Sequence, residues 1–140
     1  MIKTKSVYSP IDRKKDGLRL LVTRFRGRGL RKTRYDVWMP SLGPSEHLLQ
    51  KFSEGKITWA AFRSEYKAEI FMDGPVDERC KTIKNHGQKF SLRLIKKLAG
   101  RGPVTLLCHC DEEQEQCHRH LLQSVILSSK ISFRIPNGKA

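Results

Sequence analysis

Cysteine and histidine side chains are concentrated in one short stretch of the chain. Three of the four cysteines and three of the five histidines fall within the 13 residues from Cys108 to His120. Thiolates are nucleophiles and metal ligands, and neutral imidazoles are proton acceptors and metal ligands. This stretch therefore predicts either a nucleophile site or a metal site.

The first interpretation is a cysteine nucleophile. We expect Cys117 to start a helix, where the positive end of the helix dipole and the charge of Arg119 favour its thiolate. His118 or His109 would accept the thiol proton. The acidic run at residues 111–115 argues against this interpretation, because it raises the pKa of a nearby thiol. The candidate nucleophile site comprises Cys117, His118, Arg119 and Cys108.

The second interpretation is a metal site. If a strand continues to Cys110, Cys108 and Cys110 lie on one of its faces, while Cys117 and His120 lie one helical turn apart. Four ligands of this kind suit tetrahedral zinc. The sequence favours no cofactor, and zinc is the alternative. In a third, purely structural interpretation, Cys108 completes a buried strand and His118 is a hydrogen-bonded side chain on an apolar helix face.

A strand and a helix must position these residues. The short apolar run from Val104 to Cys108, entered through Gly102-Pro103, predicts a buried strand. Apolar residues at helical spacing predict a helix from about residue 117 to residue 128. The reactive side chains therefore lie on a strand-to-helix turn. In parallel α/β sheets, ligands bind in the crevice beyond the carboxyl ends of the strands, so a site is expected at this turn.

The rest of the chain predicts an α/β fold: a single three-layer domain, residues 1–140, with a small, mostly parallel sheet flanked by helices. Strands are expected near residues 2–7 and 18–25, and Asp16-Gly17 between them suggests that they are neighbours. Ser45 and Thr58 are expected to cap two helices, and an aromatic stripe in the second predicts a core face. Residues 131–135 are a candidate last strand before the tail. We interpret the isolated Cys80 as a small buried side chain.

Positive charge is the second strong signal. The formal net charge is +14, and residues 1–34 hold twelve Lys or Arg against two Asp. Such clustering favours anionic partners, here nucleic acid or a phosphate-bearing small molecule. The basic loop at residues 24–34 follows an expected strand and carries glycines that let a ligand approach the backbone. Tyr35 and Trp38 are candidates for stacking a base. The candidate ligand-binding residues are Arg24, Arg26, Arg28, Lys32, Asp36, Trp38 and Ser45.

Two segments carry a family resemblance. The run from Leu20 to Leu30, with Arg24 and Arg26-Gly27, and the run from Asp36 to Ser45, with Trp38 and Gly43-Pro44-Ser45, resemble the signature of the YeaO-like small proteins, the domain-of-unknown-function family 488. The later Cys117-His118-Arg119 is similar to another motif of that family. The resemblance covers residues 2–127. It implies an α/β fold and a cytoplasmic microbial protein, and it brings no settled activity or cofactor.

Two classes of protein are disfavoured by the sequence. No apolar stretch approaches the roughly 20 residues that a membrane-spanning helix needs. The residues from Met1 to Lys5 lack the apolar core of a signal peptide. We therefore expect a cytoplasmic protein with no membrane partner, in which the cysteines are reduced or bound to metal. Whether the protein is an enzyme is not decided by these patterns.

Overall fold

The computed structural model describes residues 1–71 and 88–128. Cys80, His86 and the candidate strand at residues 131–135 lie outside these ranges. The elements, in chain order, are β1 (Ile2–Ser6), α1 (Arg13–Asp16), β2 (Leu18–Leu21), η1 (Lys32–Arg34), β3 (Val37–Trp38), η2 (Pro40–Leu42), α2 (Glu46–Ser53), α3 (Trp59–Phe71), α4 (Gln88–Ala99), β4 (Val104–Cys108) and α5 (His118–Leu127).

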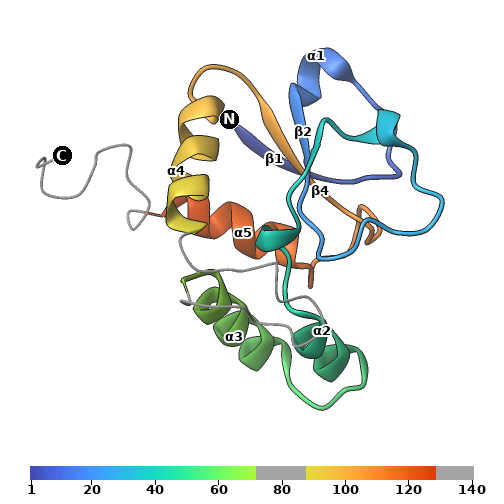
Figure 1. Ribbon diagram of the computed structural model, residues 1–140, viewed down its shortest axis with the longest axis vertical. Coiled ribbons are helices and arrows are strands. Elements are labelled where there is room, and N and C mark those ends of the chain that lie inside the picture. The colour runs from blue at the N-terminus through green and yellow to red at the C-terminus, as the bar shows by residue number, and fades with distance from the viewer. Residues whose placement is uncertain (72–87, 129–140) are drawn as a thin grey trace, which may run out of the picture.

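The strands form one parallel sheet in the order β1-β4-β2-β3, so the expected α/β class is confirmed (Figure 1). The expectation that the first two strands are neighbours is wrong, because β4 lies between them. Two parallel strands require a crossover, and Asp16-Gly17 ends the helix of that crossover, α1, instead of forming a hairpin. Gly17 has φ +62°, and a Cβ there would lie 2.1 Å from the carbonyl oxygen of Pro103.

The two faces of the sheet are covered unequally. Alternate strand residues such as Leu20 and Leu106 face a large core shared with α2, α3, α4 and α5. The intervening residues Leu21 and Leu107 face a small core closed by Val7 and Leu30. In Figure 1, α4 and α5 lie on one side of the strands and α1 on the other, while α2 and α3 form a pair below α5. These are the layers of a three-layer domain.

The helix caps form where the sequence predicts them. The Ser45 side chain accepts a hydrogen bond from the backbone N–H of Leu48 at 3.1 Å, at the start of α2. Thr58 accepts one from Ala61 at the same distance, before α3. The aromatic stripe of α3 faces the core, since Phe62 and Tyr66 are buried. These contacts hold α3 in place against α5 and the site.

No helix within residues 1–71 and 88–128 has the length and the apolar character needed to cross a membrane.

Candidate thiol and histidine site

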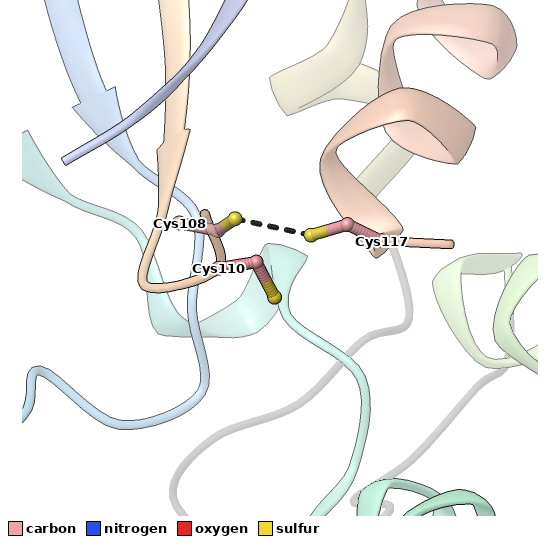
Figure 2. Close-up of side chains that lie close together, drawn as sticks. All are labelled: Cys108, Cys110 and Cys117. Carbon is pink, nitrogen blue, oxygen red and sulfur yellow. Dashed lines mark hydrogen bonds between the residues drawn. The ribbon is translucent and has the colours of Figure 1, made fainter. Parts of the chain in front are cut away.

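Three thiols converge where β4 ends and α5 begins. Cys108 is the last residue of β4, Cys110 follows in the turn, and Cys117 directly precedes α5. Their Sγ atoms all lie within 4.8 Å of one another, and those of Cys108 and Cys117 are 3.0 Å apart (Figure 2). Cys108 and Cys117 are buried, whereas Cys110 is partly exposed. The cluster is therefore reached from solvent through Cys110.

The turn is closed by a buried arginine. The Arg119 side chain has no exposed surface, and its Nη1 donates to Cys108 Sγ at 2.8 Å and to the Cys110 carbonyl oxygen at 3.2 Å. Its Nη2 donates to the carbonyl oxygens of Asp111 at 2.9 Å and Glu112 at 3.2 Å. The Asp36 carboxylate lies elsewhere and accepts hydrogen bonds from Arg13 and from the backbone N–H of Arg19. Arg119 thus places a positive charge directly against the thiols.

His118 lies behind Cys117 and is held in one orientation. Its Nε2 lies 2.7 Å from the Val22 carbonyl oxygen, which can only accept, so Nε2 carries the hydrogen. Nδ1 then presents its lone pair 3.9 Å from Cys117 Sγ. Burial lowers the pKa of His118 to about 4, so the ring is neutral at pH 7. Tyr66 of α3 packs edge-on against it, with ring centroids 5.8 Å apart.

The three thiols ionise unequally because they share protons. Hydrogen bonds from Cys108 and Cys117, aided by the charge of Arg119, hold the pKa of Cys110 far below its usual value. The hydrogen bond with Cys110, together with burial, raises the pKa of Cys108 to about 11, although Cys117 and Arg119 act to lower it. Hydrogen bonds with Cys108 and Cys110, together with burial, raise the pKa of Cys117. Cys110 is therefore the first thiol to become a thiolate. The assignment of Cys117 as nucleophile stays a prediction, and these contacts favour Cys110 for that role.

The remaining histidines of the stretch are engaged elsewhere. His120 lies 2.9 Å from the Gln114 carbonyl oxygen through Nε2 and 3.4 Å from Thr4 Oγ1 through Nδ1. It is not part of the thiol cluster, which contains the other three residues of the predicted zinc set. His109 contacts the Phe25 carbonyl oxygen at 3.2 Å and Tyr8 Oη at 3.3 Å. His109 therefore joins the thiol turn to the basic loop.

Four residues of the predicted ligand-binding set have structural contacts. Arg24 is buried and donates to the carbonyl oxygens of Gly43 at 2.9 Å and Pro44 at 3.2 Å. Trp38 Nε1 donates to Thr23 O at 2.8 Å, although its side chain remains 38% exposed. Asp36 binds the Arg19 backbone N–H at 2.8 Å. Ser45 is buried at the start of α2 and bonds to Glu69.

The other members of that set lie nearer the solvent. Arg28 and Lys32 are exposed, and Arg26 is half-buried. The loop that carries them follows β2, and β2 pairs with β4, so both loops leave the same edge of the sheet. A Cβ on Gly27, which has φ +90°, would lie 2.7 Å from the His109 ring. The structure thus brings the basic loop beside the thiol turn, as the fold class implies.

Two parts of the site carry no sequence signal. The Val22 carbonyl oxygen that orients His118 lies 96 residues away along the chain. Tyr66 belongs to a stripe that periodicity explains fully as core, yet it also packs on His118. Both contacts depend on how α3 and β2 are placed around α5, so no local pattern could have revealed them.

The comparisons with known proteins identify a family for the chain. A family model described as "DUF488-N3a: Active DUF488-N3 subclade" matches residues 2–130. The chain belongs to the DUF488-N3a family. Over 71 aligned residues, this DUF488-N3a chain is 38% identical to "Uncharacterized protein YeaO" of Escherichia coli (strain K12). The alignment covers 49% of this chain and 61% of that protein. The family resemblance noted from the sequence is thereby confirmed. No solved structure matches the chain.

Proposed function

We propose that this domain binds one thiophilic metal ion, Zn²⁺, at Cys108, Cys110 and Cys117. The observation that carries the proposal is the convergence of three sulfur atoms within 4.8 Å of one another at a strand-to-helix turn. Thiolates at such spacing are the ligands that zinc prefers in closed sites.

The distances are close to those of a zinc site. Tetrahedral zinc with Zn–S bonds of about 2.3 Å separates its sulfur ligands by about 3.8 Å. The Cys108 and Cys117 sulfurs, 3.0 Å apart, would open by about 0.8 Å to admit the ion. Cys110 lies in a turn without regular secondary structure, so its side chain has the freedom to adjust. Small side-chain movements are therefore enough to form the site.

The charges also balance. Three thiolates and one Zn²⁺ carry a net charge of about −1, counted as formal charges. Arg119 supplies one positive charge, fully buried, in direct contact with Cys108. A buried charge is costly unless it is paired, so an anionic zinc-thiolate group and this guanidinium compensate each other. The surroundings thus favour the metal-bound form.

His118 is the best fourth ligand. Its Nδ1 lone pair lies 3.9 Å from Cys117 Sγ, against about 3.6 Å expected between nitrogen and sulfur ligands of one zinc ion. Metal-binding histidines usually donate their other N–H to a carbonyl or carboxylate, and His118 donates to Val22 O. His120, which the sequence pattern suggested, has both ring nitrogens committed to other partners.

Native mass spectrometry and metal analysis of protein purified without chelator test the proposal. We expect about one zinc per chain, lost in Cys110→Ser and retained in the matched control Cys80→Ser. His118→Gln should lower zinc content while His120→Gln leaves it unchanged. If His118→Gln misfolds, coupling between bound ¹¹³Cd and the His118 ring nitrogen in ¹⁵N-labelled wild-type protein answers the same question.

The zinc proposal would be overturned by protein that carries no metal and takes up none on anaerobic reconstitution. Selective alkylation of Cys110 in such protein would instead support a cysteine-dependent enzyme, in keeping with the word "Active" in the family description.

A second candidate function is binding of nucleic acid or of a phosphate-bearing small molecule by the basic loop. It is supported by the contact of that loop with the thiol turn through His109, at the edge of a parallel sheet where ligands bind. Its test is the salt dependence of binding, since contacts to phosphates weaken linearly on logarithmic scales as salt is added. Binding that does not respond to salt would contradict it.

A further inference from the structure

A small hollow lies beside the thiol turn and is lined by positive charge. Its volume is about 180 Å³. It lies where the chain leaves β1 and β2, at the carboxyl edge of the sheet. The residues that line it are Tyr8, Arg28, Gly29, Leu30, Arg31 and Arg34. Three arginines and no acidic residue line the hollow, so its chemistry is that of an anion site.

One of the three arginines is held in place by the backbone. Arg34 donates through Nε and Nη2 to the Val7 carbonyl oxygen at 3.0 and 2.8 Å, and through Nη2 to the Ser9 carbonyl oxygen at 2.7 Å. Its charge is therefore fixed at the hollow. Arg28 and Arg31, which also line the hollow, are exposed residues. Gly29, between them, has φ +78° and open space at its Cβ position.

Size and charge together limit the ligand. Sites for whole small molecules are usually about 300–1,000 Å³, so a hollow of about 180 Å³ takes one group of a larger molecule. Guanidinium groups match the geometry of phosphate oxygens and bind them bidentately. A terminal phosphate is close to dianionic at pH 7, since its second pKa is about 6, and it attracts three arginines more strongly than a singly charged diester does.

We propose that this hollow binds the terminal phosphate of a phosphate monoester, carried either by a nucleoside monophosphate or by the 5′ end of a nucleic acid. The proposal rests on the second candidate function above and replaces most of its predicted residues. Arg28 is kept from that set, while Arg31, Arg34 and Tyr8 are added.

The hollow is connected to the thiol turn. Tyr8, which lines it, contacts His109 Nδ1 through its hydroxyl at 3.3 Å, and the two rings are 5.9 Å apart. His109 directly precedes Cys110, the partly exposed member of the thiol cluster. A ligand anchored here by its phosphate has the Tyr8 and His109 rings beside it, on the path toward Cys110.

Calorimetric titration at low salt tests the proposal with four probes. Two are AMP and adenosine, and the other two are the same short oligonucleotide with a 5′-phosphate and with a 5′-hydroxyl. The test variant combines Arg28→Gln and Arg31→Gln, and leaves Arg34 in its backbone contacts. The control combines Arg63→Gln and Lys67→Gln, two exposed residues of α3, and removes the same charge. We expect the test variant to bind phosphate-bearing probes at least about tenfold more weakly than the control.

The outcomes separate the two proposals. If no probe binds wild-type protein, the phosphate-binding function itself fails. If probes bind but the test and control variants behave alike, or if the 5′-phosphate makes no difference, the function stands and the hollow is not its site. Tighter binding of the phosphorylated oligonucleotide than of AMP supports a nucleic-acid end as the source of the phosphate, and equal binding supports a free nucleotide.

Discussion

Replacing Arg119 by methionine tests whether a buried cation compensates the thiol cluster. Methionine has a similar length and no charge, so it fills much of the same space without donating hydrogen bonds. The change removes the two donors to Cys108 Sγ and Cys110 O, and the two to the carbonyl oxygens of Asp111 and Glu112. Cys110 would then lose one of the neighbours that stabilise its thiolate.

The expected loss of stability is large. Removing one partner of a buried charged pair typically costs about 3–5 kcal/mol, and the low end of that range applies here because the Cys110 thiolate is partly exposed. The hydrogen bonds to the carbonyl oxygens of Asp111 and Glu112 are part-buried, and Arg119 Nη2 also lies 3.8 Å from the Glu112 carboxylate, so losing these contacts adds to the cost. We therefore expect the free energy of unfolding to fall by about 3 kcal/mol or more.

Urea unfolding with reductant and chelator measures this difference in the absence of metal. Arg63→Met, at an exposed position of α3, is the control and should stay within about 0.5 kcal/mol of wild type. Repeating the measurement with zinc should widen the gap, since wild type gains binding free energy and the variant gains less. A loss of less than about 1 kcal/mol in Arg119→Met would refute the charge-pair reasoning.

Three further predictions concern proton release from the thiols, the Asp16 carboxylate and the tight backbone position of Gly17. Zinc binding at pH 7 should release about two protons per ion, from Cys108 and Cys117, because their pKa values are raised while that of Cys110 is lowered. Calorimetry in buffers of different ionisation enthalpy counts the released protons. A count of zero or three would contradict the shared-proton arrangement. Burial opposes ionisation of Asp16, yet hydrogen bonds from Asp12, Lys5 and Arg19 leave its pKa lowered overall. The ionised carboxylate therefore stabilises the fold fully above its unfolded pKa, and this stabilisation is lost as pH falls through the folded pKa. The difference in unfolding free energy between wild type and Asp16→Asn should be largest above about pH 5 and should vanish in acid, and a difference independent of pH would rule this out. Gly17→Ala should destabilise the protein far more than Gly55→Ala, because both glycines have positive φ but only Gly17 has a backbone atom, Pro103 O, 2.1 Å from the added Cβ; equal losses in thermal unfolding would show that the clash relaxes.

Much of the secondary structure could be predicted because it depends on local chemistry. Ser45 and Thr58 mark helix starts, since their side chains satisfy backbone N–H groups that the helix leaves free. The Val104 strand is short, apolar and fully buried, as its composition suggests. The order of strands was not accessible in this way. Asp16-Gly17 looks like a hairpin turn locally, and only the insertion of β4 between β1 and β2 makes it a crossover.

The candidate site was predicted in part. The clustering of Cys108, Cys110 and Cys117 follows from their position on one turn, and the structure brings their sulfurs together. His120 appeared the better fourth ligand because helical spacing places it one turn from Cys117. The structure favours His118, since the carbonyl of Val22, the residue after β2, orients its ring. That carbonyl belongs to another part of the chain, so spacing within residues 108–120 carries no information about it.

The sequence by itself determined the α/β class, the turn that carries the thiols and the excess of positive charge, because these depend on composition and on the periodicity of neighbouring residues. Tertiary structure alone decided which charges are buried and which meet solvent. In the sequence, Arg24 is a candidate ligand-binding residue and Arg119 belongs to the candidate nucleophile site, yet both donate to backbone carbonyls of distant or folded-back segments. Arg28 and Arg31 remain at the surface. Burial depends on which segments pack together, and that packing joins residues far apart in the chain.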